Sequence, residues 1–193
     1  MTRSVPAAVL TVSDRCSRGE TPDASGAFLV SALREAGYRA ELPRVVPDEA
    51  TEITRALLRL ADEEGARLIL TTGGTGLSPR DVTPEATRPL LEREAPGIAE
   101  ALRARALRAT PHGMLSRGLA GARGEVLIVN LPGSLKAVRE AFEVLAPVLP
   151  HALELLSGSG ASPADHAPPL AAGEEVRDGS PRPGASAGGR PAA

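Results

Sequence analysis

Apolar and polar positions follow two different periods along the first 38 residues. Residues 7–14 (AAVLTVSD) form a continuous apolar run that ends in two polar residues, which is typical of a short buried strand. Residues 24–38 repeat their apolar positions at helical spacing, and Gly37 is placed to end the helix. The chain is therefore expected to begin with a strand followed by a helix.

The same succession recurs in the next stretch of chain. Residues 39–48 predict a weaker strand, and Pro43 interrupts it. Because proline cannot donate to a strand ladder, this strand is expected toward the edge of a sheet. Residues 49–65 predict an amphipathic helix, and residues 66–74 (ARLILTTGG) predict the next buried strand.

The pattern after this strand predicts helix. A long helix is expected from Thr83, with Pro84 suited to its first position and an interruption at Pro96, to about Arg108. A shorter helical piece, punctuated by glycine, is expected over residues 112–121.

The last elements are a strand and a helix. Residues 124–134 (GEVLIVNLPGS) form the most apolar strand, and Ser134 begins a closing helix to Leu156, kinked or split at Pro147 and Pro150.

Strands that alternate with helices of this length pair in parallel through right-handed crossovers, with helices on both faces of the sheet. The sequence therefore predicts an α/β fold with a mostly parallel sheet. In such sheets ligands bind beyond the carboxyl ends of the strands, so the loops after residues 12, 46, 72 and 129 are the candidates.

Composition divides the chain near Ser157. Residues 158–193 are rich in Gly, Pro, Ala and Ser and have almost no large apolar residue. Such a segment cannot bury enough surface to offset its ordering entropy. We expect a folded domain over residues 1–157 and a disordered tail over residues 158–193.

Charge and composition exclude several classes of protein. The 193 residues carry a formal net charge of −2, which gives no basic field to attract nucleic acid or an anionic membrane. Two Phe, one Tyr and no Trp leave few platforms for stacking bases.

Cys16 is the single cysteine, which fits a reducing compartment. No apolar run resembles a secretory signal or approaches the ~20 residues of a membrane span, so we expect a cytoplasmic protein.

The loop after residue 72, in the stretch TTGGTGLSPRD, has three glycines within four residues. Gly73, Gly74 and Gly76 permit positive φ and remove Cβ atoms, so consecutive backbone N–H groups can converge on one anion such as phosphate. The loop matches neither the Walker A motif nor the dinucleotide-binding glycine pattern. A tight strand-to-helix turn explains the glycines equally well.

Two aspartates follow neighbouring strands. Asp48 and Asp81 could hold Mg²⁺ together with substrate phosphates, or they could serve as a helix cap and a turn residue. Arg80 can pair with phosphate through its planar fork, or with Asp81 or Glu85 on the surface.

The first and last loops carry further candidates. Ser13 and Asp14 in the first loop, and Asn130, Gly133 and Ser134 in the last, are suited to an anion site at a helix N-terminus. Ordinary helix capping explains them equally well. The three histidines share no close spacing, which gives no support for a histidine metal site or a triad.

The order of these motifs resembles a known family. The stretches TVSDRCSRGETPDASG, PDE, TTGGTGLSPRDVTPEAT, SRGLAG and LIVNLPGS together are similar to the molybdenum cofactor biosynthesis family, which includes the Mog and MoaB proteins and the G domain of gephyrin. The resemblance covers residues 7 to about 157. It implies a three-layer α/β domain that forms a homotrimer, binds molybdopterin and adenylylates its terminal phosphate with Mg-ATP. Other enzymes of molybdenum cofactor biosynthesis are the macromolecular partners that it implies.

The resemblance also assigns residues. Asp48 and Asp81 match the two functional aspartates of the family, as catalytic residues and candidate Mg²⁺ ligands. The ligand-binding loops are matched by Ser13, Asp14, Gly73, Gly74, Thr75, Gly76, Arg80, Ser116, Asn130, Pro132, Gly133 and Ser134. Two alternatives stay open: a binding or scaffold module that holds molybdopterin without catalysis, and a nucleotide-binding protein of related fold with another substrate.

Overall fold

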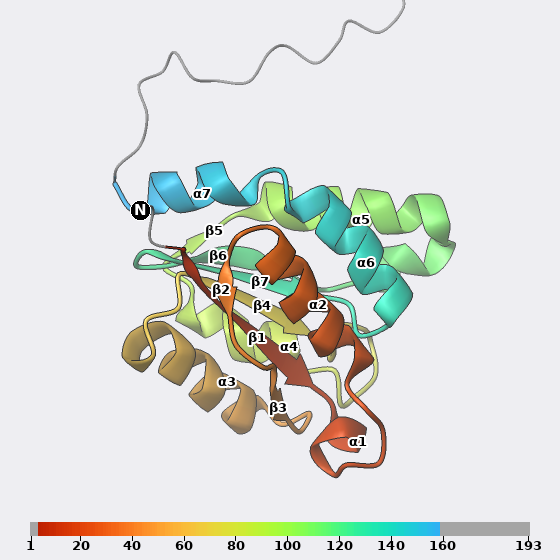
Figure 1. Ribbon diagram of the computed structural model, residues 1–193. Coiled ribbons are helices and arrows are strands. Elements are labelled where there is room, and N and C mark those ends of the chain that lie inside the picture. The colour runs from red at the N-terminus through yellow and green to blue at the C-terminus, as the bar shows by residue number, and fades with distance from the viewer. Residues whose placement is uncertain (1–3, 159–193) are drawn as a thin grey trace, which may run out of the picture. The chain divides into compact units, whose positions relative to one another are not determined.

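The computed structural model describes residues 4–158 and builds them around a seven-stranded sheet (Figure 1). The strand order is β2-β1-β4-β7-β6-β5, and β3 pairs with β1 on the same side as β2. The strands are β1 (Pro6–Val12), β2 (Arg39–Ala40), β3 (Arg44–Val46), β4 (Leu68–Thr72), β5 (Arg93–Glu94), β6 (Ala120–Arg123) and β7 (Val126–Leu131). The tail expected over residues 158–193 lies outside the described residues from 159 onward.

Pairing is parallel in the centre of the sheet and antiparallel at one end. β1 pairs in parallel with β2, β3 and β4, and β4 pairs in parallel with β7. β6 runs antiparallel to both β7 and β5. The predicted α/β fold with a mostly parallel sheet is confirmed, as is the edge position of the strand that Pro43 interrupts.

Helices cover both faces, as Figure 1 shows: α2, α5, α6 and α7 lie on one side of the sheet, and α3 and α4 on the other. The helices are α1 (Asp14–Ser17), α2 (Ala24–Glu35), α3 (Ala50–Leu58), α4 (Thr83–Thr87), α5 (Pro96–Ala109), α6 (Leu135–Leu145) and α7 (Leu149–Leu156). Alternate residues of each central strand face opposite layers, so Leu68 and Leu70 of β4 join the α2–α6–α7 core while Ile69 joins the α3–α4 core. No helix among residues 4–158 is long and apolar enough to cross a membrane.

The prediction of one long helix from Thr83 to Arg108 is wrong for the middle of this stretch. After α4 a single 3₁₀ turn leads to the short edge strand β5, and Pro96 begins α5 rather than interrupting a helix. The helical piece expected over residues 112–121 is also wrong, because a 3₁₀ turn at Pro111–Leu115 gives way to β6. The Ala-Gly-Ala-Arg sequence of β6 has weak strand propensity, and its pairing with β7 determines its conformation.

Candidate functional site

Four loops meet at one edge of the sheet, since β1, β3, β4 and β7 are parallel and end on the same side. The backbone ties the loops together: the Ser13 amide donates to the Val46 carbonyl at 2.9 Å, and the Gly73 amide donates to the Leu131 carbonyl at 3.2 Å. The four candidate loops at the carboxyl ends of the strands thus lie together, as the sequence predicts.

Gly73 and Gly74 have the positive φ values, 102° and 63°, that favour glycine. A Cβ at Gly73 would lie 2.2 Å from the Val12 carbonyl oxygen, and one at Gly74 would lie 2.3 Å from Thr83 Oγ1. Thr83 in turn binds the loop, because its hydroxyl donates to the Gly73 carbonyl at 2.9 Å and its amide to the Gly74 carbonyl at 3.0 Å. The two glycines are therefore required for close packing as well as for the turn.

Gly76 does not use the positive φ that glycine permits. This residue has φ outside the left-handed range, and a Cβ there would lie 2.9 Å from Asp81 Oδ2. Its small size gives room to the Asp81 carboxylate. Gly133 similarly lets the last loop approach the glycine loop, because a Cβ at Gly133 would lie only 3.3 Å from Gly73 Cα.

The amides of the glycine loop are available for a ligand. Within residues 4–158, no hydrogen bond has the N–H group of Gly74, Thr75, Gly76 or Leu77 as its donor. Consecutive unpaired N–H groups beside glycine are the donors that bind phosphate and other anions. The loop therefore keeps the chemical capacity that its glycines suggested.

Asp14 and Asp48 are joined by a reciprocal pair of hydrogen bonds. The Asp14 amide donates to Asp48 Oδ2 at 2.7 Å, and the Asp48 amide donates to Asp14 Oδ1 at 3.0 Å. Arg80 closes the group, since its Nη2 lies 2.9 and 2.8 Å from the two Asp14 oxygens. Arg80 therefore pairs with Asp14, rather than with Asp81 or Glu85.

The surroundings of Asp14 and Asp48 shift the pKa values of their carboxyl groups in opposite directions. The hydrogen bond from Arg80, with a second from the Asp48 amide, lowers the pKa of Asp14. Burial raises the pKa of Asp48, and the nearby charges of Asp14 and Asp81 act in the same direction. A cation or a donor-rich ligand beside Asp48 would relieve this cost.

Neither Asp48 nor Asp81 acts as a helix cap. Glu49 and Val82 occupy the N-cap positions of α3 and α4, and neither helix has a side-chain cap. Asp81 instead stabilises a turn, because the Ser78 amide donates to Asp81 Oδ2 at 2.8 Å. The turn interpretation of Asp81 is thus correct in its geometry, while its carboxylate still borders Gly76.

The carboxylates also fit a magnesium ion that is shared with substrate. No group of three His, Cys, Asp or Glu side chains within the described part of the chain could hold a metal alone. Asp48 Oδ1 would lie 3.4 Å from a Cβ at Gly74, and Asp81 Oδ2 would lie 2.9 Å from one at Gly76, so both border the glycine loop. One or two carboxylates plus substrate phosphates are the usual ligands of Mg²⁺ in phosphoryl-transfer sites.

Thr75 and Gly76 of the glycine loop also line a cavity of about 250 Å³. Its size is near the lower end of the roughly 300–1,000 Å³ of small-molecule sites. It is mostly apolar, and α5 and α6 supply much of its wall. Five of the predicted site residues line it: Thr75, Gly76, Ser116, Asn130 and Pro132.

Asn130 also carries an unpaired acceptor, on a side chain that faces Thr71 and, in α4, Thr87. The residue is only 3% exposed, and its Nδ2 donates to Thr71 Oγ1 at 3.0 Å and to Thr87 Oγ1 at 3.1 Å. The Thr87 hydroxyl donates its own proton to the Thr83 carbonyl, so it must accept from Asn130, which fixes the orientation of the amide. Asn130 Oδ1 is buried with no hydrogen-bond partner among residues 4–158. A buried acceptor of this kind is costly unless a ligand donor or water binds it.

Ser13 and Ser134 have structural partners. Ser13 Oγ accepts from the Cys16 amide at 3.2 Å and caps α1, while Ser134 Oγ accepts from the Ala137 amide at 3.3 Å and caps α6. The capping alternative therefore accounts for the hydroxyl groups of both serines.

The sequence did not indicate four residues that the structure adds to the site. Arg105, His112 and Glu140 line the cavity from α5, a 3₁₀ turn and α6, with Arg105 Nη1 3.4 Å from Glu140. Arg117 bonds to the glycine loop itself. Only Arg117 carried a signal, because it follows Ser116 within the SRGLAG stretch that was already part of the resemblance.

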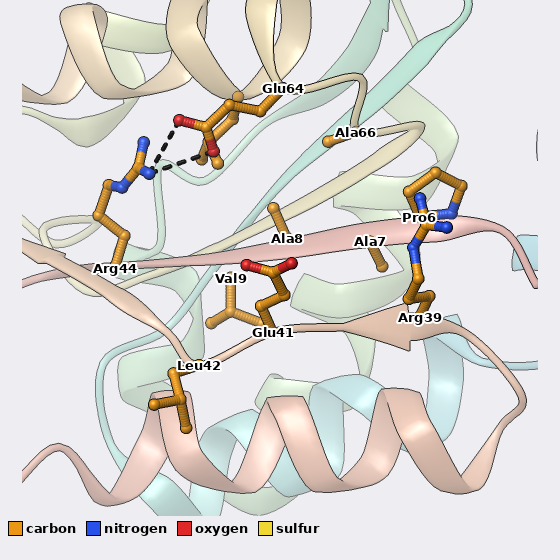
Figure 2. A pocket seen from close by; sticks show the side chains of 11 residues that line it. Pro6, Ala7, Ala8, Val9, Arg39, Glu41, Leu42, Arg44, Glu64 and Ala66 are labelled. Carbon is orange, nitrogen blue, oxygen red and sulfur yellow. Dashed lines mark hydrogen bonds and ion pairs between the residues drawn. The ribbon is translucent and has the colours of Figure 1, made fainter.

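A second, smaller hollow of about 130 Å³ lies between β1 and the broken edge of the sheet (Figure 2). β2 pairs with Pro6 and Ala7 while β3 pairs from Leu10 onward, so the edge is interrupted beside the middle of β1. Figure 2 shows the Arg44–Glu64 ion pair of 2.9 Å at this hollow. None of the predicted site residues lines it.

The fold and the loops define the class of protein: an α/β domain whose candidate ligand site lies at the carboxyl ends of parallel strands. A family model described as a probable molybdopterin binding domain matches residues 8–151. The chain belongs to this molybdenum cofactor biosynthesis family, which confirms the resemblance seen in its motifs.

Individual relatives agree with this membership. The crystal structure of MoaB from Thermus thermophilus is 51% identical, covers 81% of this chain and 98% of its own, and superposes with a TM-score of 0.75. The molybdopterin adenylyltransferase of Helicobacter pylori strain J99 is 38% identical over 78% of this chain and 87% of its own length. The molybdenum cofactor synthesis protein cinnamon of Drosophila melanogaster is 45% identical over 79% of this chain. The chain spans only 26% of cinnamon and 22% of Dictyostelium discoideum gephyrin.

Proposed function

We propose that this chain is a molybdopterin adenylyltransferase that transfers AMP from Mg-ATP to the terminal phosphate of molybdopterin. The observation that carries the proposal is the glycine loop, whose amides at residues 74–77 have no protein acceptor within residues 4–158. Asp48 and Asp81 border this loop, and two of its residues, Thr75 and Gly76, line an apolar cavity. Relatives named molybdopterin adenylyltransferase, such as that of Helicobacter pylori, support the choice of substrates.

The cavity suits molybdopterin, and the charged residues near the glycine loop suit the nucleotide. The apolar cavity suits a flat pterin ring. The amides of Thr75 and Gly76 suit the phosphate at the other end of molybdopterin. Asp14, Asp48, Arg80 and Asp81 then face the nucleotide phosphates.

In the reaction an oxygen of the molybdopterin phosphate forms a bond to the α-phosphorus of ATP. The bond between the α-phosphorus and its bridging oxygen breaks, and pyrophosphate leaves with that electron pair. The attacking phosphate is already ionised, so little acid–base catalysis is required, and neither a histidine nor a cysteine is needed. Positioning and charge neutralisation supply most of the catalysis in such transfers.

The chain contributes orientation. Asp48 and Asp81 would hold Mg²⁺, which when bound neutralises charge on the phosphates. The loop amides hold the attacking phosphate, and Arg80 is a donor that can turn from Asp14 to a nucleotide phosphate. The homotrimer, and contacts with other enzymes of the pathway, belong to the same proposal and are supported by the family resemblance alone. Light scattering on the purified chain measures the trimer directly.

The decisive experiment is incubation of the purified chain with molybdopterin and Mg-ATP, with adenylylated molybdopterin detected by mass. α,β-Methylene-ATP is the matched control, because it keeps the phosphates but cannot release pyrophosphate. We expect product and an equal amount of pyrophosphate with ATP, and neither with the analogue. Tight binding of molybdopterin without product would instead identify a binding or scaffold module.

A further inference from the structure

Arg117 makes an unusual set of contacts with the glycine loop. Its Nε donates to the Gly76 carbonyl at 2.6 Å, and its Nη2 donates to the Asp81 carbonyl. Its backbone amide donates to the Thr75 carbonyl at 2.9 Å, and its Nη1 pairs with Glu85 of α4. One residue thus binds the loop at its start, at its end and at the helix that follows.

These bonds determine where the loop amides point. In a trans peptide the C=O and the N–H of the next residue lie on opposite sides. Carbonyls of Thr75 and Gly76 that face Arg117 therefore direct the amides of Gly76 and Leu77 away from it. Those amides are among the ones without a protein acceptor in the described part of the chain.

Three of the five N–H groups of the guanidinium already bond to the protein. Two backbone carbonyls and the Glu85 carboxylate already occupy its Nε, Nη1 and Nη2 atoms. The side chain is 32% exposed, and its partner Glu85 offsets its charge. Most of the bonds of Arg117 are therefore made to the loop itself, through which it can act on a ligand.

We propose that Arg117 is the positioning residue of the glycine loop, holding the carbonyls of Gly76 and Asp81 on one side so that the loop amides present a preformed anion site on the other. This inference rests on the proposed function for the identity of the anion, a phosphate group of the substrates. Nothing in the family match or in the names of the relatives assigns this role to Arg117.

Arginine is needed for its planar fork. Nε and Nη2 lie in one rigid plane and can reach two carbonyls at once, whereas a lysine ammonium keeps the charge but is a single point. Arg117→Lys therefore removes the two-carbonyl contact and retains the positive charge beside Glu85. The backbone bond to Thr75 also remains, which favours a folded variant.

Arg67 provides a matched control just before the start of β4, at the opposite end of this strand from the glycine loop. Its Nε donates to the Glu125 carbonyl at 3.0 Å and its Nη1 pairs with the Glu125 carboxylate, with a side chain 29% exposed. Arg67→Lys thus breaks the same kinds of bond at nearly the same exposure, away from the loop. Any general cost of an arginine-to-lysine change appears in both variants.

Steady-state adenylyl transfer is the first test. We expect Arg117→Lys to lower kcat/KM between about tenfold and a hundredfold, with KM for molybdopterin raised as well as kcat lowered, because a misplaced binding group weakens both states. Arg67→Lys should stay within about twofold of the wild type. An unchanged KM, with kcat reduced only by the fraction of unfolded protein, would overturn the proposal.

Hydrogen exchange of the free protein tests the loop without any substrate. The Ser78, Asp81 and Thr83 amides are hydrogen-bonded within the loop, so we expect them to exchange faster in Arg117→Lys and at the wild-type rate in Arg67→Lys. Equal exchange in Arg117→Lys and wild type would overturn the proposal whatever the enzyme catalyses.

A failure of the proposed function is distinguishable from a failure of this inference. If the wild type forms no adenylylated product, the proposed function fails, and binding of inorganic pyrophosphate replaces the kinetic test. Pyrophosphate bound more weakly by Arg117→Lys than by Arg67→Lys supports the positioning role. Equal affinity of the two variants overturns it.

Discussion

Two of the hollows in the described part of the molecule share one feature and differ in what surrounds it. One lining residue of each has a buried side-chain atom without a hydrogen-bond partner among the described residues: Oδ1 of Asn130 at the larger of the two and Nη1 of Arg44 at the smaller. Asn130 is 3% exposed and its amide is fixed by two threonines, whereas the Arg44 side chain is 35% exposed. Both atoms are buried, and they differ in what holds their side chains: two threonines hold the Asn130 amide, whereas the Glu64 carboxylate pairs with Arg44.

The origin of each hollow explains the difference. The smaller one results from an interrupted edge strand, at a proline that cannot donate to the ladder. The larger one lies where parallel strands end, and Thr75 and Gly76 of the glycine loop line it. The larger of the two is therefore the better candidate for a ligand site, because the N–H groups of Thr75 and Gly76 in its lining have no acceptor among residues 4–158.

Replacement of Gly74 gives the largest expected effect. Gly74→Ala places a Cβ at φ 63° and 2.3 Å from Thr83 Oγ1, so the loop must shift. We expect binding of molybdopterin to weaken by on the order of a hundredfold or more, as for a binding group displaced by about 1 Å. Isothermal titration with molybdopterin measures the change.

Gly65 supplies the control for this change, beside the smaller hollow. Gly65→Ala also places a Cβ at positive φ, 70°, but nothing lies within 4 Å of it. It should cost roughly 1 kcal/mol of stability and leave binding unchanged. Equal binding by the two variants would remove the glycine loop from the ligand site.

Asp81→Asn separates catalysis from binding. Asparagine can still accept the Ser78 amide and keep the turn, but it loses the charge. We expect turnover to fall on the order of a hundredfold, the scale of losing a positioned electrostatic group, with a smaller effect on binding. Single-turnover formation of adenylylated molybdopterin at saturating Mg-ATP measures this.

Glu64→Gln is the corresponding change at the smaller hollow, where the carboxylate pairs with Arg44. It should leave turnover at the wild-type level. Near-normal turnover by a well-folded Asp81→Asn protein would defeat the catalytic assignment of Asp81 and leave Asp48 as the residue to test.

Much of this architecture is predictable from the chain, because the relevant signals are local. Continuous apolar runs predict β1, β4 and β7, and Pro43 predicts the weak edge. Parallel strands place their carboxyl ends together, so the four site loops follow from the fold alone.

The remainder depends on contacts between distant residues. β5 has two residues and β6 reads Ala-Gly-Ala-Arg, so only their pairing with neighbours makes them strands. The role inferred for Arg117 requires Gly76, Asp81 and Glu85 to lie around it, 32 to 41 residues away along the chain. No local pattern encodes such a contact set.

Asn130→Ala tests the value of the unpaired acceptor directly. It removes Oδ1 together with the bonds to Thr71 and Thr87, so we expect KM for molybdopterin to rise about tenfold and stability to fall by roughly 1–3 kcal/mol. Arg44→Met, at the other hollow, should leave KM unchanged. A similar KM for both variants would show that the acceptor of Asn130 has no greater role in binding molybdopterin than the donor of Arg44.

The smallest expected effect is a pH-dependent change in stability at the carboxylates that border the glycine loop. Burial raises the pKa of Asp48, which means that the native state holds this proton more tightly than the unfolded state. Ionised Asp48 therefore lowers stability, and the loss is absent below its ordinary pKa of 3.8 and complete above its raised native pKa. Asp48→Asn removes this loss and can still accept the Asp14 amide. We expect the variant to melt at the same temperature as the wild type in acid and at a slightly higher temperature at neutral pH, while its activity falls.

Asp14→Asn should behave in the opposite way over the same range. The Arg80 hydrogen bond lowers the pKa of Asp14, so its charge stabilises the native state above its ordinary pKa of 3.8, and that contribution is lost as the pH falls through the lowered value. The Asp14→Asn variant should therefore melt below the wild type at neutral pH and approach it in acid. Thermal melts of the three proteins across this pH range measure both signs. Two variants that shift in the same direction would contradict the assignment of a destabilising charge to Asp48 and a stabilising one to Asp14.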